Sequence, residues 1–115
     1  MVKMTANQNQ ILYDKLSDLM ISTLEFIVGE DEYALKKVNS WDARISERCL
    51  VNLAKLGMPF KYIVTSVITS KKDGYEKLNV FSTCFWNKDT DFKCTVKWEN
   101  KTVMCILSIY ALALN

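Results

Sequence analysis

The second half of the chain constrains the fold most, because four strand-like runs follow one another there. Side chains along a strand point alternately to its two faces. In three of these runs apolar side chains fall on both faces: Phe60–Thr69, Val80–Trp86 and Val103–Tyr110. Only the run Phe92–Trp98 is one-sided, with lysines and a threonine between its apolar residues. This is more apolar surface than one small domain can hide, so the pattern predicts a partner.

Length and composition indicate one globular domain. The chain has 115 residues, 50% of them hydrophobic and 24% charged. We expect a flexible leader over residues 1–8 and a single domain over residues 9–115. The net charge of +2 is too small and too scattered for a basic stripe that would bind nucleic acid. There is neither an apolar run of about 20 residues nor a signal-peptide pattern, which favours a cytoplasmic protein without direct membrane insertion.

Two helices are expected before the strands. The first should run from Asn9 to Val28 and stop at Gly29, with a buried stripe of apolar and small residues at three- and four-residue steps: Leu12, Leu16, Leu19, Thr23 and Phe26 or Ile27. We expect Asp31 to cap the second helix, which Gly57 and Pro59 would end. Its buried stripe should consist of apolar residues with the same spacing: Val38, Trp41, Ile45, Cys49, Leu53 and Leu56.

This order predicts an α+β fold with two N-terminal helices packed on a four-stranded antiparallel sheet. Short polar connections between the strands fit a meander. Two helices cover only one face of such a sheet. The uncovered face would carry an apolar patch, formed either by the following set or by its opposite set: Ile63, Val67, Phe81, Phe85, Met104 and Ile106. Alternation alone does not decide between the two sets, and either predicts a homodimer packed sheet against sheet.

The sequence offers no constellation for catalysis, a metal or a cofactor. The chain has no histidine, which removes the commonest general base and zinc ligand. Its three glycines are isolated, so no phosphate-binding loop exists. The four cysteines lack a C-x-x-C pair, and we interpret them as reduced core residues: Cys49, Cys84, Cys94 and Cys105. We therefore expect a protein that is not an enzyme. What remains is geometric, because the edge of an open sheet can accept a strand from a partner peptide.

Ordered blocks of residues resemble the Tctex-type dynein light chain family. They span nearly the whole chain: Val38, Asn39 and Trp41; Leu53, Lys55, Leu56 and Gly57; Pro59–Thr65; Cys84–Trp86; and Cys94–Thr102. The resemblance implies two helices on a four-stranded sheet, and a homodimer that exchanges one strand between subunits. It also implies a non-catalytic role, in which the dimer binds a disordered segment of the dynein intermediate chain and links cargo to microtubule-based transport.

With this resemblance we expect Leu78–Phe85 to be the exchanged strand. Its residues along the peptide groove would be Val80, Phe81, Ser82, Thr83 and Cys84, for which plain packing is the alternative reading. The dimer interface would contain Ile63, Val67, Phe81, Phe85, Trp86, Met104 and Ile106. The expected partners are a second copy, the dynein intermediate chain and tails of cargo proteins, in a cytoplasmic, microtubule-associated setting with an axonemal one as the alternative. A motor-independent adaptor that uses the same groove is the second functional hypothesis.

Overall fold

The computed structural model describes residues 6–71, 80–87 and 91–114. Two helices come first, α1 (Ala6–Ile27) and α2 (Leu35–Ala54). Four strands follow: β1 (Phe60–Ser70), β2 (Val80–Asn87), β3 (Asp91–Glu99) and β4 (Val103–Ala113). The α+β class and the order of elements are therefore confirmed. α1 begins inside the expected leader, of which residues 1–5 lie outside the described part. Neither helix combines the length and apolar character needed to cross a membrane.

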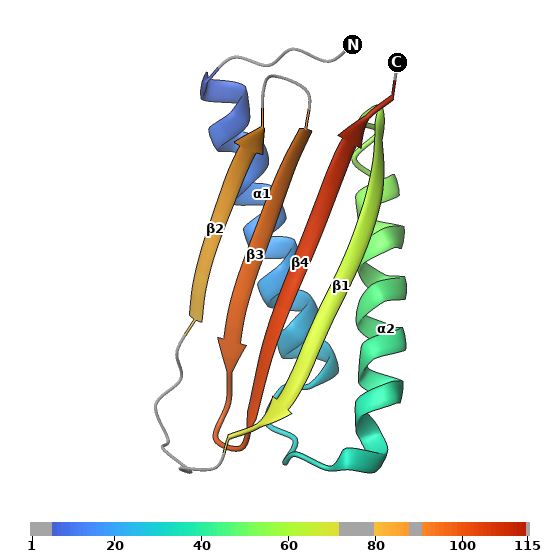
Figure 1. Ribbon diagram of the computed structural model, residues 1–115, viewed down its shortest axis with the longest axis vertical. Helices are drawn as coiled ribbons and strands as arrows, with labels where there is room; N and C mark the ends of the chain where they lie inside the picture. The colour runs from blue at the N-terminus through green and yellow to red at the C-terminus, as the bar shows by residue number, and fades with distance from the viewer. Residues whose placement is uncertain (1–5, 72–79, 88–90, 115) are drawn as a thin grey trace.

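The strands form one antiparallel sheet in the order β1-β4-β3-β2. Both helices lie on the same side of this sheet, α2 behind β1 and α1 behind β3 and β4 (Figure 1). The expected meander is correct for β2, β3 and β4 but wrong for β1, which pairs with β4. Consecutive strands β1 and β2 consequently occupy opposite edges of the sheet. The alternation of residues along a strand predicts which side chains share a face. It does not predict the neighbouring strand, which is set by contacts between residues distant in sequence.

The helix ends follow mostly from local chemistry. Gly29 and Gly57 have φ angles of 54° and 65°, a left-handed conformation that glycine adopts without a Cβ clash. The expectation that Asp31 caps α2 is wrong, because the N-cap residue is Ala34. The Asp31 N–H instead donates to the Val28 carbonyl at 3.0 Å. Asp31 thus belongs to the turn that closes α1.

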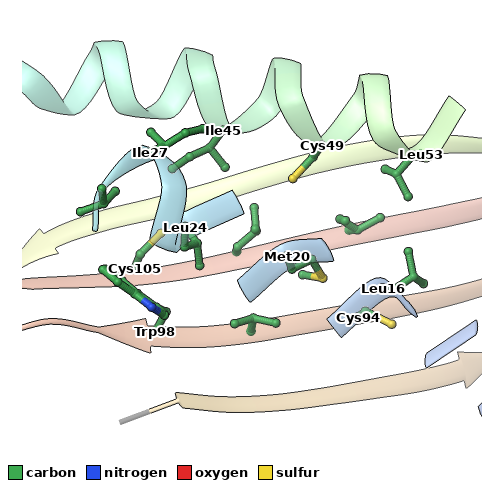
Figure 2. Packing of buried hydrophobic residues seen from close by; sticks show 14 of the residues in the cluster. Leu16, Met20, Leu24, Ile27, Ile45, Cys49, Leu53, Cys94, Trp98 and Cys105 are labelled. Atoms are coloured by element: carbon green, nitrogen blue, oxygen red, sulfur yellow. The ribbon is translucent and has the colours of Figure 1, made fainter. Parts of the chain in front are cut away.

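The core lies between the helices and the sheet, where one stripe from each helix meets the buried face of β3 and β4 (Figure 2). The α2 stripe is confirmed for Trp41, Ile45, Cys49 and Leu53, which are buried, while Val38 and Leu56 at its two ends are only partly buried. On α1 the buried stripe also includes Met20 and Leu24, which were not predicted, whereas the predicted Leu19 is only partly buried. Phe26 was one of two candidates for its end and is 65% exposed; Ile27 takes the buried place.

The hairpin between β3 and β4 is tied to the connection between the helices by Asn100. The Nδ2 of this side chain donates to the carbonyls of Gly29, at 2.8 Å, and Asp31, at 3.0 Å. Its Oδ1 accepts the N–H groups of Thr102 and Val103 at 2.9 and 2.8 Å. One amide therefore fixes both the hairpin and the position of the helical layer above it.

We expect Asn100→Ala to lower the free energy of unfolding by about 2–4 kcal/mol, because each lost hydrogen bond contributes roughly 1 kcal/mol and leaves partly buried groups unpaired. Urea denaturation followed by circular dichroism would measure the change. Asn39→Ala removes an exposed asparagine from α2 and serves as the matched control. Superimposable curves for Asn100→Ala and the unchanged protein would contradict the role of this side chain.

Candidate functional site

β2 is an edge strand, and within the described part of the chain β3 is its only strand neighbour. The expected exchanged strand, Leu78–Phe85, falls on β2 from Val80 onward. Leu78 and Asn79 lie outside the described residues. The backbone of β2 continues to Asn87, but the side chains of Phe85, Trp86 and Asn87 are also outside the described part. The five expected groove residues therefore lie together along one open edge.

The backbone groups that face this open edge can be identified from the pairing of β2 with β3. Residues directly opposite in an antiparallel pair alternate between hydrogen-bonded pairs and closer pairs without such bonds. Cys84 and Cys94 lie opposite with their Cα atoms 4.1 Å apart, which marks a close pair. By alternation, Val80 and Ser82 belong to close pairs as well. The N–H and C=O groups of Val80, Ser82 and Cys84 hence point away from β3.

A contact from α1 supports this assignment. The Tyr13 hydroxyl donates to the Ser82 carbonyl at 3.0 Å and lies 3.2 Å from the Ser82 Oγ. The carbonyl can accept this bond because it does not point into the ladder with β3. Tyr13 therefore holds the edge strand against the helical layer. Tyr13 was not predicted as a site residue, because no signal in the sequence links a residue beside the α1 stripe to a strand 69 positions away.

The side chains of β2 divide between the two faces of the sheet. Phe81 is 59% exposed and Thr83 is also exposed, and both point away from the helices. Ser82 and Cys84 are half-buried on the helical side, where Cys84 packs against the core. Both predicted roles of these residues, lining a peptide groove and packing, therefore fit the strand. The backbone lines the open edge, while the side chains either pack under the helices or stay exposed on the other face.

The interpretation of all four cysteines as reduced core residues is wrong for two of them. Cys84 and Cys94 form a disulfide across β2 and β3, because the register places them opposite each other. Cys49 and Cys105 are free and fully buried (Figure 2). Burial raises the pKa of the Cys49 thiol to about 11, against the lowering effects of a hydrogen bond with Thr23 and the charge of Arg48. Burial likewise raises the pKa of Cys105 to about 12.

The face of the sheet opposite the helices carries the expected apolar patch. In the described residues no element covers it. Ile63 is 45% and Val67 59% exposed there, while Met104 and Ile106 are half-buried on the same face. Of the two sets left open, the structure selects the one that includes these residues. We call this surface the outer face, and it includes every expected interface residue whose side chain is described.

The outer face is organised in rows that run across the strands. One row joins Val67, Ile106, Lys97 and Phe81, which are successive partners in the register. The next row toward the middle of the sheet contains only hydroxyl side chains: Thr65, Ser108, Thr95 and Thr83. Within it, the Thr95 Oγ1 lies 3.0 Å from the Ser108 Oγ. The outer face thus carries a row of three apolar residues and Lys97 beside a polar central row.

Two lysines of β3 lie on the outer face without pointing straight out from it. The Lys93 ammonium lies 5.1 Å from the centre of the Tyr110 ring, within the range of a cation–π contact. The Lys97 ammonium lies 3.6 Å from a carboxylate oxygen of Glu99. Such arrangements lay the apolar stems along the sheet, so the lysines are compatible with a covered face.

A second surface lies on the helices. An open pocket of about 390 Å³ lies between the end of α1 and α2, and charged residues of both signs line it: Arg44, Glu47, Arg48 and Lys55. The Arg48 guanidinium lies 4.1 Å from the centre of the exposed Phe26 ring. No group of three or more acidic, cysteine or histidine side chains that would suit a metal occurs among the described residues.

Comparison with known proteins places the fold in a context. The family model of the Tctex-1 family matches residues 10–112. A protein of Drosophila melanogaster named dynein light chain Tctex-type is 42% identical over 106 residues, which cover 92% of this chain and 94% of that protein. Human dynein light chain Tctex-type 3 is 35% identical over 101 residues, covering 88% and 85% respectively. A Dictyostelium discoideum protein named dynein light chain Tctex-type is 26% identical over 98 residues, covering 84% and 86%.

We expect Tyr13→Phe to loosen β2, because it removes only the hydroxyl that bonds Ser82. Losing about 1 kcal/mol should speed amide exchange at Phe81 and Thr83 roughly fivefold, since these residues belong to the hydrogen-bonded pairs with β3. Hydrogen exchange followed by NMR would measure the rates. Tyr33→Phe removes a hydroxyl from the connection between the helices and is the matched control. Unchanged amide exchange rates in the Tyr13→Phe variant would show that the hydrogen bond from Tyr13 to Ser82 does not stabilise β2.

Proposed function

Because the chain belongs to the Tctex-1 family, we propose that it serves as a light chain of the dynein motor and binds a disordered segment of the dynein intermediate chain by strand addition. The chain is not an enzyme, in keeping with the family. The observation that carries the proposal is the open edge of β2, where the backbone groups of Val80 and Cys84 and the Ser82 N–H turn outward, while the Ser82 carbonyl accepts the Tyr13 hydroxyl. An extended peptide gains affinity from such groups whatever its sequence, and selectivity from alternate side chains.

The active unit in this proposal is a homodimer packed outer face to outer face. The uncovered row that contains Val67, Ile106 and Phe81 supports this, since soluble monomers rarely expose large apolar patches. Lys93 and Lys97, laid along the sheet, leave that patch accessible to a second copy. A two-fold axis would bring the same residues of both subunits together. The helices would then lie on the outside of the assembly.

Exchange of β2 between the subunits is the second part of the proposal. β1 and β2 follow each other in sequence yet lie at opposite edges of the sheet. An edge strand meets only one neighbouring strand, so either copy of the chain can supply it without changing the register against β3. Each β2 would then bond to β3 of the partner subunit, and Tyr13 would hold a strand that belongs to the other copy.

Two open β2 edges in one dimer would bind two peptide segments. When those segments belong to paired intermediate chains, the second binding event is intramolecular and gains from a high effective concentration. The same edges could take tails of cargo proteins, linking them to transport along microtubules in the cytoplasm. This arrangement fits a subunit that assembles other proteins.

We expect Val67→Asp to raise the dissociation constant of the dimer roughly 100-fold or more, because an unpaired carboxylate in the interface costs about 3 kcal/mol or more. Sedimentation velocity of the reduced protein over a dilution series would measure it. Val51→Asp places the same charge on α2, at a residue with similar exposure, 51% against 59%, and should leave the dimer intact. A protein that sediments as a monomer without either substitution would overturn the dimer.

Peptide binding should show the alternation of an added strand. N-methylation of every second peptide amide within the bound segment should abolish binding to the dimer, because those N–H groups face β2. Methylation of the intervening amides should change the dissociation constant by less than about threefold, since they face solvent. Isothermal titration with an intermediate-chain peptide would measure both series. Equal effects in the two series would exclude strand addition.

Affinity capture from a native lysate separates the motor role from that of a motor-independent adaptor. A dynein light chain should recover the intermediate and heavy chains of dynein together with the bait. Recovery of other proteins that contain the same peptide motif, without dynein chains, would favour the adaptor. Capture with the Val67→Asp variant controls for the need for two binding edges, because a monomer lacks the second edge.

A further inference from the structure

The disulfide between Cys84 and Cys94 joins the edge strand to the interior of the sheet. Cys94 is buried on β3, and Cys84 is half-buried beside it under the helical layer. Their Cα atoms lie 4.1 Å apart in a directly opposed pair. Cys84 is also one of the residues whose backbone faces the open edge. The bond therefore fixes the middle of the strand that carries the proposed peptide groove.

The other two cysteines do not compete for this bond. Cys49 and Cys105 are fully enclosed between α2 and β4 in the core. Burial raises the pKa of both thiols, and the thiolate is the reactive form. At neutral pH these residues stay protonated and out of reach of an oxidant in solution. Oxidation of the folded chain is thus directed to the pair on β2 and β3.

We propose that Cys84 and Cys94 form a redox-controlled covalent bond between the two subunits of the dimer. This inference rests on the strand exchange in the proposed function. In the single chain the two cysteines belong to one subunit. If β2 is supplied by the partner subunit with the same register, Cys84 of one subunit lies opposite Cys94 of the partner subunit. Two-fold symmetry makes two such bonds in each dimer. Oxidation then turns an assembly held by packing and hydrogen bonds into one that cannot dissociate.

The oxidant is a small disulfide such as oxidised glutathione. The thiolate of Cys84, the half-buried member of the pair, attacks a sulfur of this disulfide, forms a mixed disulfide and releases one reduced glutathione. The second cysteine then attacks the protein sulfur of the mixed disulfide and releases the other glutathione. Two cysteine S–H bonds and one glutathione S–S bond are broken, while one protein S–S bond and two glutathione thiols form. Excess reduced glutathione reverses both steps.

The consequence for the groove is mechanical. An edge strand bonded to one neighbour can fray, and fraying would withdraw the outward backbone groups from a peptide. A covalent bond at Cys84 holds these groups in place next to β3. The oxidised dimer should therefore keep its peptide sites at dilutions where the reduced dimer separates into subunits.

Mixed dimers of two complementary variants test the proposal. Cys84→Ser chains and Cys94→Ser chains, one of them lengthened by a tag, are mixed under reducing conditions and then exposed to oxidised glutathione. In an exchanged dimer of the two variants, one Cys84 meets one Cys94 between the subunits. Non-reducing electrophoresis should show a band at the summed mass of the two chains. Within either chain alone no such bond can form, because each lacks one of the two cysteines.

The controls separate this result from other linkages. Each variant oxidised alone should remain at its chain mass, and so should the Cys84→Ser/Cys94→Ser double variant, which keeps Cys49 and Cys105. The unchanged protein should run at twice its 13.3 kDa chain mass and return to that mass with dithiothreitol. A double variant that crosslinks would show that the bond uses other cysteines and would overturn the proposal.

Two further outcomes would also overturn the proposal. An internal disulfide in the unchanged protein at single-chain mass would place the bond within one subunit. Two free thiols at these positions after oxidation, found by alkylation and mass spectrometry, would exclude the bond altogether. Sedimentation of the reduced protein is done first. A reduced monomer would refute the dimer of the proposed function, whereas a reduced dimer without crosslinks would refute only the redox bond.

Discussion

The structure depends on one constraint: the sheet has two faces, but the helices of this chain cover only one of them. The helical stripes and the one-sided strand β3 satisfy the inner face, where Leu16, Ile45 and Val96 are completely buried. On the outer face of β1 and β4, apolar residues such as Val67 and Ile106 stand beside hydroxyl residues such as Thr65, and nothing in the described chain covers them. The uncovered outer face follows from this arrangement, whereas the open edge of β2 and the cysteine pair follow from the strand order and register of the same sheet.

Much of the fold could be predicted from the sequence because it rests on local periodicity. The three- and four-residue spacing around Trp41 and Cys49 predicts the buried face of α2, and alternation around Val96 predicts that of β3. Strand neighbours could not be predicted in this way, since the pairing of β1 with β4 joins residues more than 30 positions apart. The N-cap of α2 was misplaced because Asp31 takes part in the turn that closes α1.

The residue range of the candidate site was predicted from the sequence, but the backbone groups of β2 that face the open edge were not. Alternation assigns the side chains of Phe81 and Ser82 to opposite faces. Which backbone groups point outward depends instead on the phase of pairing with β3, and only the structure gives that phase. The contact between Tyr13 and Ser82 and the disulfide between Cys84 and Cys94 arise from the same long-range register. The spacing of ten residues between the two cysteines does not reveal that register.

The central row of hydroxyl groups on the outer face has a consequence for how two copies can meet. In the proposed dimer, one docking position sets each row of hydroxyls against polar partners and each apolar row against apolar ones. Sliding one sheet along the other by a single row would place the exposed Thr65 and Thr83 against side chains such as Val67 and leave their hydroxyls without hydrogen bonds. Shifted positions of the two sheets are therefore disfavoured in either direction of sliding. In such a dimer the hydroxyl row would favour one relative position of the two sheets and oppose sliding between them.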